Sequence, residues 1–166
     1  MSSSQTIAPA GVVSGQIRPP GSKSITNRAF VCAALADGLT ELVGVLDSDD
    51  TRVMIESLRR LGLRVDGDTA TGNWQVGGGG GQLPAAAADL FIGNSGTSVR
   101  FLTAMVAVAH GTYHLDGVPR MRERPIEDLV KALNQLGSDV RCEAGTKCPP
   151  VTVNARGLQG GTTEIN

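Results

Sequence analysis

The stretch S-I-T-N-R (residues 24–28) opens a sequence pattern that the chain repeats from G-T-S-V-R (residues 96–100). In both copies an apolar run follows, then a segment typical of a strand, then a helical pattern that ends in Leu-Gly, at residues 61–62 and 136–137. An internal repeat indicates the architecture, because each copy folds into the same kind of unit. Each copy also places small polar residues and an arginine at a predicted helix start, where backbone N–H groups bind anions.

The composition fits a folded globular domain. The 166 residues are 40% hydrophobic and 19% charged, and their formal net charge is −1. This charge argues against nucleic acid or an anionic membrane as a partner, and an aromatic content of 3% argues against base-stacking surfaces. We expect no membrane span, because no stretch approaches the ~20 apolar residues needed. The Ser-rich residues 1–6 lack the features of a secretory signal.

The three cysteines predict neither a disulfide framework nor a zinc site. Cys32 lies in an apolar helical run, and we expect it in the core. Cys142 and Cys148 have no histidine nearby, which is poor spacing for zinc. A reducing cytoplasm is therefore the expected compartment.

Each copy predicts a β-α-β-α-β-β unit. In the first copy we expect helices at 24–37 and 49–61 and strands at 12–18, 39–46, 63–65 and 74–76. In the second we expect helices at 96–109 and from Pro125 to Leu136, and strands at 89–92, 112–118, 138–142 and 151–153. The five glycines at 77–81 lack the Lys-Ser/Thr of a phosphate-binding loop, so they are interpreted as a flexible connection. Two such units predict an α/β or α+β fold with helices packed against sheets.

Cations accompany both predicted helix starts. Gly21–Ser24 combines a hydroxyl with the Lys23 ammonium, and Arg28 follows one turn later on the same face. Gly93–Ser98 combines flexible backbone with hydroxyls, and Arg100 follows. Each segment alone is also compatible with an ordinary capped helix or a glycine-containing turn. Their recurrence at the same place in both copies favours anion binding.

A third cationic segment, P-R-M-R-E-R-P, spans residues 119–125. Its three arginines suit bidentate binding of carboxylate or phosphate, and Glu123 is placed to hold one of them. The alternative interpretation is a solvated loop.

The cluster of acidic residues Asp47, Asp49 and Asp50 resembles a set of metal ligands, but we do not predict a metal site here. Asp49 and Asp50 fall in the first turn of a predicted helix, where acidic side chains interact favourably with the helix dipole. We therefore predict no metal site.

Together these segments resemble the 5-enolpyruvylshikimate-3-phosphate (EPSP) synthase family. The resemblance covers roughly Ala10 to Gly161 and rests on P-G-S-K-S-I-T-N-R-A, L-D-S-D-D-T-R, L-F-I-G-N-S-G-T-S-V-R, L-D-G-V-P-R-M-R-E-R-P-I and C-P-P-V-T-V-N. It implies transfer of the enolpyruvyl group of phosphoenolpyruvate to the 5-hydroxyl of shikimate 3-phosphate, with release of phosphate. It also implies that no metal or organic cofactor takes part.

The resemblance assigns roles to residues of all three segments. Lys23 is the implied catalytic residue and contacts both substrates. The implied shikimate 3-phosphate site comprises Lys23, Ser24 and Arg28. The implied phosphoenolpyruvate site comprises Lys23, Gly96 through its backbone N–H, and Arg124, with Thr97 and Arg100 in support. Phe101 departs from the family pattern, which commonly has proline after this arginine.

The resemblance also implies the domain organisation. The family domain is an inside-out barrel of three β-α-β-α-β-β units, of which this chain supplies about two. We expect a disordered tail at 1–9, a strand of the second domain's sheet at 10–19, and an incomplete N-terminal substrate-binding domain at 20–166, divided into repeats 20–82 and 83–166. Such a chain needs the C-terminal remainder of the enzyme and is expected to be inactive alone. The full enzyme is expected to be a monomer.

Two alternatives stay open from the sequence. One is a truncated, non-catalytic anion-binding module. The other is a relative of the UDP-N-acetylglucosamine enolpyruvyl transferases, which resemble the same pattern but carry an Ala-Lys-Asn type sequence at Ser22-Lys23-Ser24 and lack the segment at 119–125.

Overall fold

The computed structural model describes residues 4–164, which form four α-helices and seven strands. The helices are α1 (Lys23–Leu35), α2 (Asp49–Arg60), α3 (Gly96–Ala107) and α4 (Glu127–Gln135). The strands are β1 (Asp37–Leu42), β2 (Arg64–Asp68), β3 (Asn73–Gly79), β4 (Ala87–Phe91), β5 (His110–Asp116), β6 (Asp139–Cys142) and β7 (Val151–Arg156). Two short 3-10 turns, η1 (Met121–Glu123) and η2 (Glu143–Gly145), complete the order.

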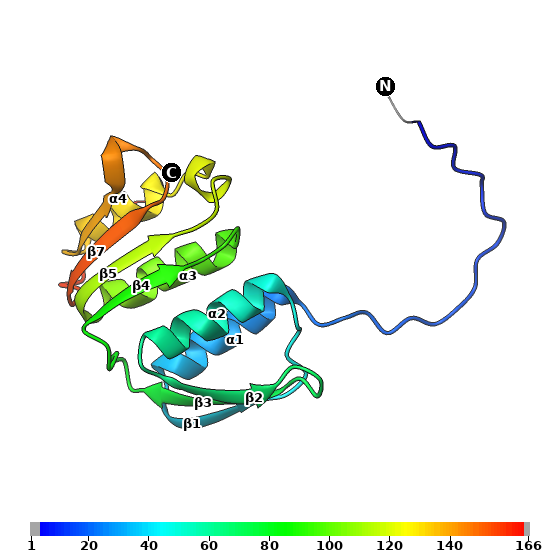
Figure 1. Cartoon of the computed structure of the whole chain (residues 1–166), viewed down its shortest axis with the longest axis horizontal. Helices are drawn as coiled ribbons and strands as arrows, with labels where there is room; N and C mark the ends of the chain where they lie inside the picture. Colours follow the sequence, from blue (N-terminus) through cyan, green and yellow to red (C-terminus); the bar gives the residue numbers. More distant parts are fainter. Residues whose placement is uncertain (1–3, 165–166) are drawn as a thin grey trace.

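The predicted repeat is visible as two units of the same topology (Figure 1). In the first unit the sheet order is β1-β3-β2, with both pairs antiparallel. In the second unit β5-β7-β6 repeats this arrangement, and β4 adds a parallel strand beside β5. The α/β class expected from the sequence is therefore confirmed.

Short polar side chains determine where three of the helices begin. Ser22 caps α1 by accepting a hydrogen bond from the Ile25 N–H, and Ser95 caps α3 by accepting from the Ser98 N–H. Ser48 caps α2, as the sequence predicts, in a reciprocal capping box with Thr51. The repeat thus places a serine-capped N-terminus at the equivalent point of each unit.

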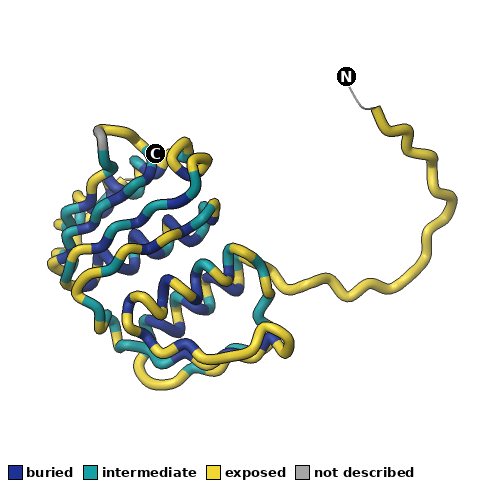
Figure 2. Tube along the Cα trace, in the orientation of Figure 1, coloured by how far each residue is buried: buried dark blue, intermediate teal, exposed yellow. Residues whose placement is uncertain are grey.

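The two units share one hydrophobic core. Figure 2 shows the buried residues along the facing sides of the helices and sheets. Phe30 of α1 packs edge-on against Trp74 of β3, with ring centroids 6.0 Å apart. Helix α1 also packs against α3, and Leu102 of α3 is fully buried in the same cluster. This contact between units brings the N-termini of α1 and α3 to one side of the molecule.

The strand predicted at 12–18 does not form in this structure, and its expected place in the sheet of a second domain stays a prediction. Residues 4–22 form no helix or strand, and Figure 1 shows them extending away from both sheets. Val12, Val13 and Ile17 are almost completely exposed. A strand requires a neighbouring strand to satisfy its backbone N–H and C=O groups, and no described strand lies beside this segment. Of the tail expected at 1–9, residues 1–3 lie outside the described range, as do residues 165–166 of the second repeat.

The interpretation of residues 77–81 as a flexible connection is wrong for its first three glycines. Gly77, Gly78 and Gly79 belong to β3 and pair with β1. A Cβ atom on Gly78 would lie 2.2 Å from the carbonyl oxygen of Ala36, just after α1. Glycine is needed here because the helix end approaches the strand backbone so closely.

Two expectations for the first helix are also corrected. Helix α1 ends at Leu35, earlier than the predicted 37, because Asp37 already pairs in β1. Cys32 is exposed, since it lies on the solvent side of α1. All three cysteines are free thiols.

Candidate anion-binding active site

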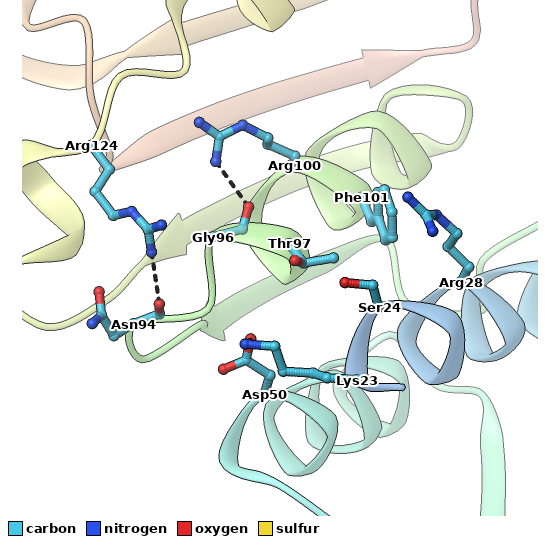
Figure 3. A pocket seen from close by; sticks show the side chains of 10 residues that line it. All are labelled: Lys23, Ser24, Arg28, Asp50, Asn94, Gly96, Thr97, Arg100, Phe101 and Arg124. Atoms are coloured by element: carbon cyan, nitrogen blue, oxygen red, sulfur yellow. Dashed lines mark hydrogen bonds and ion pairs between the residues drawn. The ribbon is translucent and has the colours of Figure 1, made fainter. Parts of the chain in front are cut away.

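The first turns of α1 and α3 line one cleft of about 460 Å³ (Figure 3). The lining residues are Lys23, Ser24, Arg28, Asp50, Asn94, Gly96, Thr97, Arg100, Phe101 and Arg124. Every site residue expected from the sequence is among them. The cleft therefore gathers four cationic side chains and one carboxylate beside two helix N-termini, whose first N–H groups have no partner within the helix.

Lys23 is held by a carboxylate from another helix. Its Nζ lies 2.9 Å from Oδ2 of Asp50, and the side chain of Lys23 is 48% exposed while that of Asp50 is 19% exposed. Asp50 stands in the first turn of α2, as predicted from the helix dipole. Its pairing with Lys23 was not predicted, because the sequence pattern shows the helix position of Asp50 and not its neighbour across the cleft.

Arg124 lies against the first residue of α3. Its Nη1 donates a hydrogen bond of 3.0 Å to the carbonyl oxygen of Asn94 (Figure 3). A Cβ atom on Gly96 would lie 2.8 Å from Cζ of Arg124, so a side chain here would displace the guanidinium from its present position. The backbone N–H of Gly96 and the donors of Arg124 are therefore close enough to bind one ligand.

The other two arginines of residues 119–125 do not line the cleft. Arg120 forms an ion pair with Glu123, as the sequence suggested. Arg122 forms a two-point ion pair with Asp116 at the end of β5, and its Nε donates a hydrogen bond of 3.0 Å. This hydrogen bonding lowers the pKa of Asp116 below its ordinary value, so the carboxylate stays charged and holds the loop.

Arg100 connects the start of α3 to the loop that carries Arg124. Its Nη1 donates to the carbonyl oxygen of Gly96 at 2.9 Å, and its Nη2 donates to that of Pro125 at 2.8 Å. The side chain thereby joins the first turn of α3 to the residue that follows Arg124. Thr97 lies one helical turn before Arg100 and lines the same cleft, and the supporting role expected for both residues stays a prediction.

A buried polar link that the sequence analysis missed connects α1 to α3. Asn27 and Ser98 are completely buried, and the side-chain amide of Asn27 donates to Oγ of Ser98 at 3.4 Å. Ser98 also accepts from Oγ of Ser95 at 2.7 Å and donates to the backbone oxygen of Asp50 at 3.4 Å. Asn27 and Ser98 occur in the two repeated motifs, which was the available signal. The link fixes three helix starts relative to one another.

The described residues contain no group of three or more His, Cys, Asp or Glu side chains arranged to hold a metal ion. Within the same range no helix has both the length and the apolar character needed to cross a membrane.

The fold and the cleft define a class of protein: a repeated α/β scaffold in which two helix N-termini and four cationic side chains line one cleft, a chemistry suited to small anions. Comparison with known proteins identifies the family within this class. A sequence model of EPSP synthase (3-phosphoshikimate 1-carboxyvinyltransferase) matches residues 7–166. The chain belongs to the EPSP synthase family.

Individual relatives agree with this assignment. The chloroplastic 3-phosphoshikimate 1-carboxyvinyltransferase of Arabidopsis thaliana is 49% identical over 168 residues, covering 96% of this chain and 32% of the relative. The enzyme of the same name from Paraburkholderia phymatum is 51% identical over 149 residues, covering 89% of this chain and 33% of the relative. The chain thus spans about a third of the length of the curated relatives it matches.

Solved structures show the same fold. EPSP synthase from Acinetobacter baumannii superposes with a TM-score of 0.79 at 29% identity, covering 86% of this chain and 32% of that one. The enolpyruvyl transferase NikO from Streptomyces tendae superposes with a TM-score of 0.60 at 23% identity, covering 87% of this chain and 31% of that one. The second likeness concerns the fold alone.

Proposed function

We propose that this chain binds shikimate 3-phosphate and phosphoenolpyruvate, as part of an enzyme that transfers the enolpyruvyl group to the 5-hydroxyl of shikimate 3-phosphate and releases phosphate. The observation that carries the proposal is the gathering of four cationic side chains between the N-termini of α1 and α3. Each substrate has a phosphate and a carboxylate, so their pair requires clustered positive charge. Membership of the EPSP synthase family favours shikimate 3-phosphate over a UDP-sugar as the acceptor.

The α1 side of the cleft is the proposed shikimate 3-phosphate site. Ser24 offers a hydroxyl in the first turn, where the helix dipole favours an anion. Arg28 lines the cleft one turn further and offers planar N–H donors that suit phosphate or carboxylate.

The α3 side is the proposed phosphoenolpyruvate site. The N–H of Gly96 and the guanidinium of Arg124 lie next to each other and supply donors of two kinds. Arg100 and Thr97 support this wall from the same helix turn.

Lys23 is the proposed catalytic residue, because its ammonium stands between the two sides. In the addition step the 5-hydroxyl oxygen bonds to C2 of phosphoenolpyruvate and loses its proton, while C3 gains a proton. The tetrahedral intermediate then loses phosphate from C2 and a proton from C3, which restores the C=C bond. A fixed ammonium stabilises negative charge on the departing phosphate more in the transition state than in the bound substrate.

Proton transfer is the part of the reaction that we assign to the rest of the enzyme. Asp50 is the one carboxylate among the described cleft residues, and it is ion-paired with Lys23. We therefore propose that the chain binds both substrates weakly and does not turn them over alone. No metal or organic cofactor is part of the proposal.

The test is to measure binding and turnover with the same preparation of the chain. Isothermal titration is expected to show binding of shikimate 3-phosphate, stronger than that of inorganic phosphate, and a phosphate-release assay is expected to show no turnover. Equal affinity for the two anions would instead support a non-catalytic anion-binding module. Robust turnover would contradict the proposed need for the remainder of the enzyme.

We propose the cytoplasm as the compartment, because the three cysteines are free thiols, as in a reducing environment. The plant relatives are named chloroplastic, so imaging of a tagged chain in its own cell is the direct test.

A further inference from the structure

We propose that Phe101 is a positioning residue that presents the guanidinium of Arg28 to the phosphate-bearing substrate. Cζ of Arg28 lies 5.8 Å from the centroid of the Phe101 ring, within the range of a cation–π interaction. Both side chains line the cleft, one from each repeat unit, as Figure 3 shows. The inference rests on the proposed function, since that function assigns Arg28 to shikimate 3-phosphate.

The other three cations of the cleft are held by oxygen atoms. Lys23 is ion-paired with a carboxylate, and Arg100 and Arg124 donate to backbone carbonyl groups. Among residues 4–164, Arg28 has no such hydrogen-bond or ion-pair partner, and its guanidinium lies over the Phe101 ring. Arg28 is therefore positioned by a different kind of interaction.

The difference has a chemical consequence. A carboxylate or carbonyl partner would occupy N–H donors of the guanidinium and, in the case of a carboxylate, offset its charge. An aromatic ring attracts the cation without supplying an acceptor oxygen or a negative charge. The donors of Arg28 thus remain available for two-point binding of a phosphate.

Phe101 is itself fixed by apolar contacts. It is half-buried on α3 and belongs to the apolar groove between α1 and α3. The remaining lining residues of that groove are Val31, Leu35, Ala104, Met105 and Val108. Phe101 also packs against the hydrophobic core, and a phenyl ring has only two rotatable bonds to restrain, so the ring offers Arg28 a positioned surface.

The geometric part of the proposal is tested without any substrate. In an NMR spectrum of the arginine Nε–Hε groups of the full chain, assigned through Arg28→Lys, the ring is expected to shift the Arg28 signal. Phe101→Leu is expected to abolish that shift. Phe91→Leu is the matched control, because Phe91 is 59% exposed on β4 and lies outside the cleft lining. An unchanged Arg28 signal in Phe101→Leu would overturn the proposal.

The functional part is tested by titrating shikimate 3-phosphate into the same variants. Phe101→Leu is expected to weaken its binding about 2- to 5-fold, the usual range for an exposed cation–π contact, while Phe101→Tyr and Phe101→Trp restore it. Phosphoenolpyruvate binding is expected to stay unchanged. Unchanged shikimate 3-phosphate affinity in the leucine variant, a loss that the aromatic variants do not restore, or equal loss for both substrates would each overturn the positioning role.

These outcomes are distinguishable from failure of the proposed function. If the parent chain binds shikimate 3-phosphate no better than inorganic phosphate, the assignment of the cleft to this substrate fails, and the ring-dependent Arg28 signal still decides the geometric claim. If the parent chain binds shikimate 3-phosphate and Phe101→Leu binds it equally well, the proposed function stands and the role of Phe101 is overturned.

Discussion

The guanidinium of Arg124 occupies the space that a side chain at Gly96 would need. A Cβ atom at position 96 would lie 2.8 Å from Cζ and Nη2 of Arg124 and 2.9 Å from Nη1. Gly96 begins the first helix of the second repeat, whereas Arg124 lies in the loop before α4. The present position of Arg124 in the proposed phosphoenolpyruvate site therefore depends on the absence of a side chain at Gly96.

Gly96→Ala is expected to displace Arg124 and to weaken phosphoenolpyruvate binding about 10-fold, the value of one charge-assisted hydrogen bond. Shikimate 3-phosphate binding is expected to change little, because its proposed site lies on α1. Titration calorimetry with each substrate measures both effects. Gly15→Ala is the control, since a Cβ atom there meets nothing within 4 Å. Equal affinity of parent and Gly96→Ala for phosphoenolpyruvate would refute the assignment.

Lys23→Ala is expected to weaken the binding of both substrates about 10-fold or more, because the ammonium faces both sides of the cleft. Lys131→Ala removes the same charge from an exposed pair with Glu127 on α4 and serves as the control. Titration of each substrate into both variants is the measurement. A change within twofold for Lys23→Ala would exclude Lys23 from the site.

The ion pair between Asp116 and Arg122 predicts a pH-dependent stability. The folded-state pKa of Asp116 is lowered, so its stabilising contribution is fully present above the unfolded-state pKa of about 3.9 and is lost as the pH falls through the folded-state value. Asp116→Asn is therefore expected to lower the Tm at pH 7. The difference from the parent is expected to vanish in strong acid. A Tm difference that does not depend on pH would contradict this explanation.

Ser98→Ala is expected to lower the free energy of unfolding by about 1–3 kcal/mol, because it leaves the buried side-chain amide of Asn27 on α1 without its hydrogen bond and removes the contact to the Asp50 backbone on α2. Ser57→Ala is the matched control. Ser57 is equally buried, but its hydroxyl donates only to the Val53 carbonyl of its own helix. Urea unfolding of both variants tests the link. An equal loss of unfolding free energy in the two variants would show that the contact between the repeats does not stabilise the fold.

The sequence was sufficient to predict what depends on local pattern. Ser48 followed by two aspartates predicted the start of α2, and the repeated motifs at 24–28 and 96–100 predicted two similar units whose helix starts face one cleft. These features follow from periodicity and capping, which act over a few residues.

Features that depend on distant contacts were not predictable in this way. The strand position of Gly78 follows from its pairing with Gly38 of β1, which lies far from it in the sequence. The partner of Lys23 is a residue of another helix, and the exposure of Cys32 depends on which side of α1 the neighbouring elements cover. The segment at 12–18 has strand-like residues but no strand beside it in this structure. Tertiary packing determines each of these outcomes.

The central claim is that the N-termini of α1 and α3 bind the two substrates in one cleft. The most direct test is to record backbone amide NMR spectra of the chain during titration with shikimate 3-phosphate and then with phosphoenolpyruvate. We predict that the first ligand shifts signals of residues 23–28 and the second shifts those of residues 94–100 and Arg124. Shifts confined to other parts of the chain, or no shifts at millimolar ligand, would contradict the account.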